Sequence, residues 1–309
     1  MNRSTFPPHL RYPARVQLKQ VTLIGVGLLG GSLGLALKQR GLARRVVGYV
    51  RREASVAECA KAGVVDHATL DLSEAVQDAN LIVFCTPLAQ MRTLAMQMSG
   101  QLRPGVLVTD VGSVKTSVIR ELAPVLKRAG AVFIGSHPMA GSEKTGPLAA
   151  RADLFEKAVC IVTPTPQTPP GAVRRLRALW KAVGARVLEL SPAQHDELVS
   201  RSSHLPHLAA AQLATLVLDP RSPKELAQLC ATGFRDTTRI ASGSPEMWRD
   251  IVSANREALG KSLRAYVRAL ENLGRLIERG DSAALEKFFN TAKQRRDAWC
   301  EQLASRSQE

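Results

Sequence analysis

A glycine-rich loop near the start of the chain restricts its fold more than any other feature. The apolar run Val21–Gly25 leads directly into GVGLLGGS (25–32), and a helical pattern follows at once. A G-x-G-x-x-G motif between a strand and a helix is typical of a Rossmann dinucleotide-binding unit, whereas a glycine-rich turn without a ligand is the alternative. In such a unit the first glycine allows the tight turn, the second admits the pyrophosphate, and the third lets helix and strand pack closely. We therefore predict that the pyrophosphate binds at the helix N-terminus, against Gly25, Gly27, Leu28, Leu29 and Gly30.

Short apolar runs alternate with helical patterns through the first 190 residues. Each run is rich in β-branched residues and apolar on both faces, as expected for strands buried between two helix layers. Helical stretches such as Ser32–Arg40 and Val114–Arg128 lie between the runs, which predicts right-handed crossovers and a doubly wound α/β sheet. The proline-rich segment 163–170 predicts a rigid loop within this domain, because a helix (Val173–Val183) and a final strand still follow. The predicted strands are Val21–Gly25, Arg45–Val50, Leu81–Thr86, Val106–Asp110, Val132–Ile134, Val159–Thr163 and Val187–Leu190.

Strand patterns stop after residue 190, and the remainder of the chain predicts an all-α domain. We expect helices to start at a capping box that opens with Ser222-Pro223, at Ser244-Pro245, and at Asp281 after a stop at Gly280. The stretch Met247–Arg279 has apolar residues at helical spacing, and so long a helix needs a surface on which to bury them. A second copy of the chain would supply that surface, so we predict a homodimer. The predicted divisions are a basic tail (1–18), a Rossmann domain (19–190) and a helical substrate and dimerisation domain (191–309).

Composition excludes several classes of protein. A length of 309 residues suits two domains, and no apolar run approaches the roughly 18 residues of a membrane span. The first 15 residues lack the apolar core of a secretory signal. The five cysteines include no C-x-x-C pair, which predicts neither disulfides nor zinc and favours the cytoplasm. The net charge of +15 is spread along the chain and aromatic residues make up 4%, so we expect anionic small molecules rather than nucleic acid as partners.

The end of the second predicted strand bears on the choice of cofactor. An acidic residue at this point binds the ribose hydroxyls of NAD, while arginine accommodates the 2′-phosphate of NADP. Here Val50 replaces the acid, Arg51 and Arg52 follow, and Glu53 comes too late to substitute for it. The sequence therefore favours NADP. If the cofactor is NAD, the two arginines are solvated surface residues.

Further polar motifs follow predicted strands or lie in the helical half. DVGSVK (110–115) and GSHPMAGSEKTG (135–146) come after strands, where open α/β sheets bind ligands. Thr86 and Pro87 likewise lie at the end of a predicted strand, and we predict that they contact the cofactor. From the residues alone, His137 could equally satisfy backbone groups at a strand end. His204 and His207 have the spacing of a metal pair, but no H-E-x-x-H or carboxylate accompanies them, so no metal is expected.

Taken in order, GVGLLGGS, DVGSVK, SHPMAGSEKTG, HLPH, GFRDTTRIA and MWRDI resemble the prephenate/arogenate dehydrogenases of tyrosine biosynthesis. The resemblance extends from about Val21 past Trp248. It implies a Rossmann domain followed by a helical dimerisation domain. It also implies a reaction in which hydride leaves the ring carbon that bears the 4-hydroxyl and the ring carboxylate leaves as carbon dioxide. Some members have a fused chorismate mutase or regulatory domain, and neither is expected here because the chain ends at Glu309.

The resemblance assigns roles to individual residues. It implies that His137 accepts the hydroxyl proton, for which imidazole is suited by its pKa near working pH. It implies that Ser113 hydrogen-bonds both His137 and that hydroxyl, and that Arg239 binds a carboxylate bidentately. Asp236 is expected to pair with Arg239, whereas His9, His67 and His195 are expected at the surface. The remaining candidates for contact with substrate are His204, His207, Ser142, Asp236, Arg235 and Trp248, with Trp248 supplied by the same subunit or by a partner subunit.

Two other functions fit parts of the same pattern. A β-hydroxyacid dehydrogenase has the same order of domains, but its catalytic lysine motif is not evident in the helical half. A non-catalytic NADPH-binding module could use the basic surface to bind nucleic acid. The motifs do not decide between prephenate and arogenate, which differ in a keto or amino group on the side chain.

Overall fold

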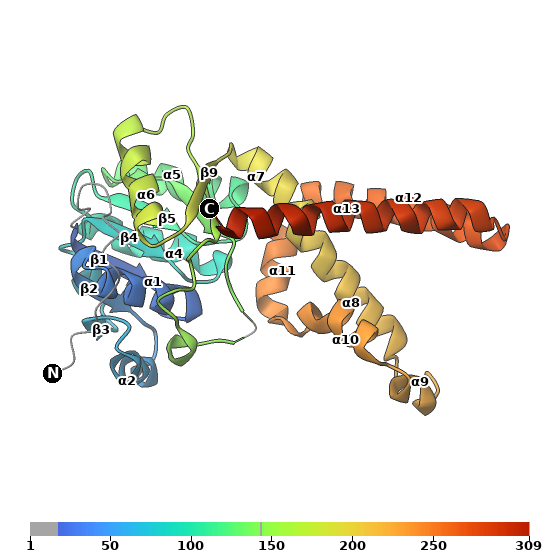
Figure 1. The fold of residues 1–309 in the computed structure, drawn as a ribbon. Helices are drawn as coiled ribbons and strands as arrows, with labels where there is room; N and C mark the ends of the chain where they lie inside the picture. The colour runs from blue at the N-terminus through green and yellow to red at the C-terminus, as the bar shows by residue number, and fades with distance from the viewer. Residues whose placement is uncertain (1–17, 143, 309) are drawn as a thin grey trace.

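The computed structural model describes residues 18–142 and 144–308, which form an α/β body and a helical arm (Figure 1). The predicted basic tail, apart from Leu18, and His9 lie outside the described residues. The change from strands to helices falls between β9 (Arg186–Glu189) and α7 (Pro192–Val199).

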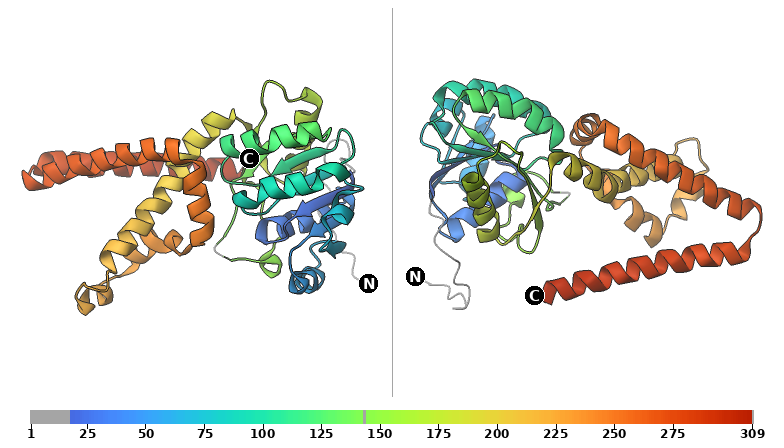
Figure 2. Two further views of the ribbon diagram at one scale, coloured as in Figure 1. Left: turned by 180° about the vertical axis from the view of Figure 1, so that it is seen from behind. Right: turned by 90° about the horizontal axis from the view of Figure 1, so that it is seen from above.

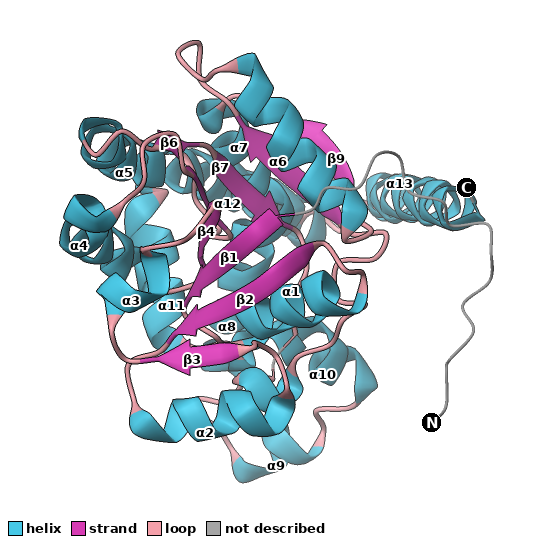
Figure 3. Cartoon of the chain, turned by 90° about the vertical axis from the view of Figure 1, so that its left-hand side faces the viewer, coloured by secondary structure: helices cyan, strands magenta, loops and turns pink. Residues whose placement is uncertain are grey.

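The described part of the α/β body contains a six-stranded parallel sheet in the order β3-β2-β1-β4-β5-β6 (Figure 3). The chain runs outward from β1 in one direction and then outward from β4 in the other, so the predicted doubly wound fold is confirmed. Ligand sites in such sheets lie where the order reverses, here between β1 and β4. The strands are β1 (Leu18–Ile24), β2 (Ala43–Tyr49), β3 (His67–Thr69), β4 (Leu81–Phe84), β5 (Leu107–Asp110) and β6 (Val132–Phe133).

Helices cover both faces of this sheet. All residues of β4 and β5 are buried, which explains their apolar character on both faces. One face packs against α1 (Leu28–Gln39), α2 (Glu53–Ala62) and α6 (Pro170–Ala182). The other packs against α3 (Leu72–Val76), α4 (Leu88–Met98) and α5 (Thr116–Arg128). Short 3-10 turns, η1 (Ser99–Gln101) and η2 (Pro147–Ala149), lie in the connections.

The last strands do not extend the six-stranded sheet, contrary to the prediction. β7 (Gly135–Pro138), β8 (Val159–Thr163) and β9 form a separate sheet, with β7 antiparallel to β8 and β8 parallel to β9. The chain passes from one sheet to the other at Gly135, where a Cβ would lie 2.6 Å from Oγ1 of Thr163. Only glycine permits this approach. As a result, His137 lies within a strand rather than after one.

The helical arm differs from the prediction in two helix starts. Oγ of Ser244 accepts from the Met247 N–H and Oδ1 of Asp281 accepts from the Ala284 N–H, which confirms both predicted caps. Ser222 is not a cap, because α9 begins at Lys224 with Pro223 at its N-cap. A capping box that was not predicted begins α7, where Ser191 and Gln194 bond each other's backbone N–H. The remaining elements are the π-helical turn η3 (Ser200–His204), α8 (Leu205–Val217), α9 (Lys224–Gln228), α10 (Thr232–Thr238), η4 (Arg239–Ser242), α11 (Pro245–Ala254), α12 (Arg256–Glu278) and α13 (Ser282–Gln308).

Asn255 divides the stretch that was predicted as one long helix. Its backbone has φ −112° and ψ 26°, which ends α11 before α12 begins. The buried Asn255 amide Nδ2 lies 2.9 Å from the Asp196 carbonyl and 3.2 Å from Nδ1 of His204. These side-chain hydrogen bonds stabilise a break that propensity alone does not predict.

The helices α12 and α13 form a hairpin whose tip points away from the α/β body, with α13 running back towards that body (Figures 1 and 2). Their apolar side chains remain exposed in the single chain, including a stripe on α12 at helical spacing that consists of Leu263, Val267, Leu270 and Ile277. None of the described helices is long and apolar enough to cross a membrane.

Candidate active site

The glycine loop between β1 and α1 is crowded on one side and open on the other. Gly25 has φ +94°, and a Cβ there would lie 2.8 Å from Cγ2 of Thr86. A Cβ on Gly30 would lie 2.3 Å from the Gly25 carbonyl oxygen, whereas a Cβ on Gly27 would meet no described atom within 4 Å. The turn and the helix–strand contact therefore require glycine for steric reasons, and Gly27 leaves room for a ligand to approach the backbone.

The start of α1 is suited to an anion. The helix begins at Leu28, earlier than predicted, and within the described residues neither a side-chain cap nor an acidic residue occupies its first turn. The first N–H groups, including those of Leu28 and Leu29, consequently have no helical partner. Oγ1 of Thr86 is buried with no hydrogen-bond partner in the described chain, and Pro87 next to it is the N-cap of α4. These groups fit a dinucleotide, with its pyrophosphate at the helix N-terminus.

The end of β2 presents two arginines to solvent. Val50 is buried, while Arg51 and Arg52 are exposed and form no ion pair with any described residue. Arg52 is the N-cap of α2, and Glu53 is the first residue of that helix. The end of β2 therefore carries positive charge that no described acidic side chain neutralises by an ion pair.

A chain of buried hydrogen bonds connects His137 to a carboxylate. Nδ1 of His137 lies 2.9 Å from Nε2 of His195, whose Nδ1 lies 2.8 Å from Oδ1 of Asp196. The prediction that His195 lies at the surface is wrong, because it is 0% exposed. The helix α7, on which it lies, packs against α5, β8 and α12, and these non-local contacts bury it. The only local signal was the His-Asp pair in the first turns after Ser191.

Charge determines the direction of these hydrogen bonds. Burial raises the pKa of Asp196, but hydrogen bonds from His195 and Thr116 outweigh burial and lower it, so the group is a carboxylate. A carboxylate only accepts, so Nδ1 of His195 donates and its Nε2 accepts from Nδ1 of His137. Burial, and then the neighbouring His195 and Lys115, hold the pKa of His137 well below its usual value. His137 is therefore neutral near pH 7, with the lone pair on Nε2.

Ser113 lies in the loop that connects β5 to α5, and the loop is held against β7. The Lys115 ammonium forms a buried ion pair with Asp110 and donates to the Ser136 carbonyl over 2.8 Å. Burial lowers the pKa of Lys115, while the charge of Asp110 opposes that effect. Among the described residues Ser113 forms no hydrogen bond with His137, whose Nδ1 is bonded to His195 instead. The position of the loop nevertheless depends on the strand that contains His137.

His204, His207 and Trp248 form an aromatic cluster in the helical arm. His207 stacks on Trp248 with ring centroids 3.4 Å apart. His204 meets the same indole edge-on, with ring centroids 6.0 Å apart. Burial, and then His195, lower the pKa of His204 to about 4. The contact with Asn255 makes Nδ1 of His204 the acceptor, so its Nε2 carries the proton and has no partner in the described part of the chain. Trp248 therefore contacts both histidines of its own chain, and these contacts do not require a partner subunit.

The other candidates, Ser142, Asp236 and Arg239, are exposed. Asp236 pairs with the neighbouring Arg235 at 3.5 Å and not with Arg239, contrary to the expected pairing. Arg239 begins the 3-10 turn η4, so the regular α-helical spacing to Asp236 is lost. Oγ of Ser142 accepts from the Lys144 N–H in an exposed loop. No hydrogen bond or ion pair joins Ser142, Asp236 or Arg239 to His137 in the residues that the structure describes.

The doubly wound sheet, the glycine loop and the neutral buried histidine define a two-domain dehydrogenase of the Rossmann class. The model of the prephenate dehydrogenase nucleotide-binding domain matches residues 33–189, and that of the prephenate dehydrogenase dimerization domain matches residues 191–291. The prephenate dehydrogenase of Bacillus subtilis is 36% identical over 91% of this chain and 76% of its own length. The cyclohexadienyl dehydrogenase of Zymomonas mobilis is 33% identical over 90% of this chain and 95% of its own.

A solved structure agrees with these relatives. The prephenate dehydrogenase of Aquifex aeolicus, in complex with hydroxyphenyl propionate and NAD+, superposes with a TM-score of 0.84 at 30% identity, covering 90% of this chain and 97% of that one. The chain belongs to the prephenate dehydrogenase family. This membership decides against the β-hydroxyacid dehydrogenase and the non-catalytic module as alternatives.

Two glycine substitutions separate ligand binding from folding. Gly27→Ala is expected to leave the thermal unfolding midpoint near that of the wild type but to weaken NADP and NAD binding, because its methyl group occupies the open side of the loop. Gly30→Ala is expected to destabilise the fold by about 1–3 kcal/mol, because its methyl group overlaps the Gly25 carbonyl. Thermal unfolding and cofactor titration measure both effects. Unchanged cofactor affinity in Gly27→Ala would show that the pyrophosphate binds elsewhere.

Proposed function

We propose that this chain catalyses the NAD(P)-dependent oxidative decarboxylation of prephenate, arogenate or both, as a step of tyrosine biosynthesis. The observation that supports it most strongly is the buried chain from Asp196 through His195 to His137, which leaves a neutral imidazole lone pair in a member of this family. The relatives named above act on prephenate or on cyclohexadienyl compounds. The cysteines are free, which supports the cytoplasmic location expected from the sequence.

In the proposed mechanism His137 acts on the ring hydroxyl. Bound nicotinamide would supply the acceptor for the hydride from the carbon that bears this hydroxyl. Nε2 of His137 accepts the hydroxyl proton as positive charge develops at that carbon. The bond to the ring carboxylate breaks, its electron pair completes the aromatic ring, and carbon dioxide leaves. His137 then returns its proton to the phenolate oxygen, which gives the phenol.

Other residues of the chain bind and orient the substrate in this proposal. Ser113 donates to the ring hydroxyl from the loop held against β7. Arg239, exposed at the start of η4, binds a carboxylate with its guanidinium. The protonated Nε2 of His204 and the stacked pair of His207 and Trp248 form the wall of the site in the helical arm.

The proposal predicts that purified protein reduces NADP or NAD when given prephenate or arogenate, and releases one carbon dioxide per hydride transferred. His137→Asn is expected to lower kcat by on the order of 10²–10⁴, the usual effect of removing a positioned acid–base group, without loss of cofactor affinity. His67→Asn is the matched control, since His67 is partly exposed and pairs with Glu74. A folded protein that turns over neither substrate would refute the proposal.

We also propose that NADP is the preferred cofactor. Val50 removes the carboxylate that would repel a 2′-phosphate, and the exposed Arg51 and Arg52 supply opposite charge. The ratio of kcat/KM for NADP to that for NAD is expected to exceed one, and to fall in an Arg51→Ala, Arg52→Ala double variant. Arg174→Ala, Arg175→Ala on α6 removes the same charge from another exposed pair and is expected to preserve the ratio. A wild-type ratio below one would contradict the proposal.

We further propose a homodimer formed by the helical arm. The exposed stripe on α12 and the match of residues 191–291 to a dimerization domain support it. Light scattering at micromolar concentration is expected to give twice the 33.4 kDa of one chain. Leu270→Glu places a charge in the stripe and is expected to favour monomer, whereas Glu271→Gln at the next position is expected to remain dimeric. A monomeric wild type would exclude this arrangement.

A further inference from the structure

The carboxylate of Asp196 contacts the start of α5, next to the loop of Ser113, and it contacts His195, which bonds His137. Its Oδ1 accepts from Nδ1 of His195 and from the Lys115 N–H, each over 2.8 Å, and its Oδ2 accepts from the Thr116 N–H over 2.9 Å. Lys115 and Thr116 are the N-cap and first residue of α5, a helix that has no side-chain cap of its own in the described chain. A carboxylate from α7 thus caps α5 from another domain.

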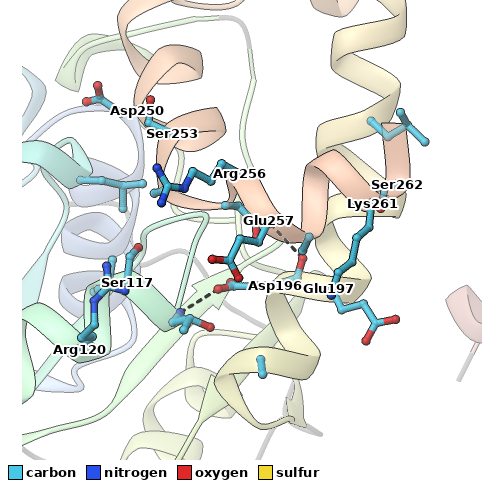
Figure 4. A pocket seen from close by; sticks show the side chains of 18 of the residues that line it. Ser117, Arg120, Asp196, Glu197, Asp250, Ser253, Arg256, Glu257, Lys261 and Ser262 are labelled. Atoms are coloured by element: carbon cyan, nitrogen blue, oxygen red, sulfur yellow. Dashed lines mark hydrogen bonds between the residues drawn. The ribbon is translucent and has the colours of Figure 1, made fainter. Parts of the chain in front are cut away.

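The same aspartate also contacts the helical arm. Nδ2 of Asn255, at the break before α12, donates to the Asp196 carbonyl over 2.9 Å. Figure 4 shows Asp196 between the start of α5 and the start of α12, at the wall of a cavity of about 1230 Å³. Three helices therefore converge on one residue, whose neighbour Glu197 points away and pairs with Arg201.

We propose that Asp196 is a positioning residue that acts on His137 and Ser113 at once. Through His195 it sets the tautomer of His137 that leaves Nε2 free to accept a proton. Through the cap on α5 it holds the loop on which Ser113 lies. The proposal rests on the proposed role of His137 as the base.

Asp196→Asn is expected to reverse the tautomer of His137. The amide of this variant can donate to Nδ1 of His195, so Nε2 of His195 then carries the proton and donates to Nδ1 of His137. The proton of His137 is consequently placed on Nε2. That tautomer cannot accept the hydroxyl proton. In a serine protease triad the equivalent change lowers kcat by about 10⁴ through the wrong tautomer.

The test is a double-mutant cycle between Asp196 and His137. Asp196→Asn alone is expected to lower kcat by on the order of 10²–10⁴, with cofactor affinity preserved. In the His137→Asn background the same change is expected to lower kcat by at least about 10-fold less than in the wild type, because the histidine that it orients is already absent and only the cap on α5 is still affected. The exposed neighbour variant Glu197→Gln is the control and is expected to keep wild-type kcat.

A second pair of variants tests the chain without touching the cap on α5. His195→Gln retains an acceptor near the position of Nε2, whereas His195→Leu has none. We expect His195→Gln to retain at least about 10-fold more kcat than His195→Leu. This comparison remains decisive if Asp196→Asn does not fold.

The outcomes separate this proposal from the proposed function. If Asp196→Asn lowers kcat by the same factor in the His137→Asn background as in the wild type, the positioning role is overturned, whereas His137 remains the base. Equal activity of His195→Gln and His195→Leu would also overturn it. Wild-type kcat in His137→Asn would refute the base itself, and the positioning role with it.

Discussion

A buried carboxylate is stable only when hydrogen bonds replace the water that it has lost, and Asp196 receives them from two domains. The carboxylate caps α5, bonds His195, and through it orients His137. The backbone carbonyl of the same residue bonds Asn255, where α11 ends and α12 begins. The junction of the α/β body and the helical arm, the loop of Ser113 and the protonation state of His137 therefore depend on one set of contacts.

Much of the α/β body could be predicted because its signals are local. The glycine loop, the apolar runs and the helical stripes each lie within a few residues, and their order implies the crossovers. The second sheet could not be predicted in this way. Its separation depends on the close approach of Gly135 to Thr163, which are far apart in the chain. The break at Asn255 likewise depends on partners in η3 and α7.

The candidate site shows the same limit. Motifs identified His137, His204, His207 and the glycine loop, and the structure brings the two histidines of the arm together with Trp248. His195 was missed because its segment, SPAQHDELVS (191–200), is polar and has no apolar periodicity, while its burial comes from β8, α5 and α12. No sequence pattern specifies a tautomer, because that property belongs to the hydrogen-bond partners.

The central claim is that His137 is a neutral base, which the pH dependence of kcat/KM tests most directly because it reports groups of the free enzyme. His195, Lys115 and His204 act on His137, with Asp196 beyond His195, and burial together with these three neighbours lowers the pKa of His137 below 6.5. Since only the neutral form accepts a proton, activity should persist down through pH 6.5 and fall at lower pH, as the lowered pKa is passed. We expect this fall in kcat/KM on the acid side in the wild type and its loss in His137→Asn. A fall centred at or above pH 6.5, or the same fall in the variant, would contradict a neutral His137 base.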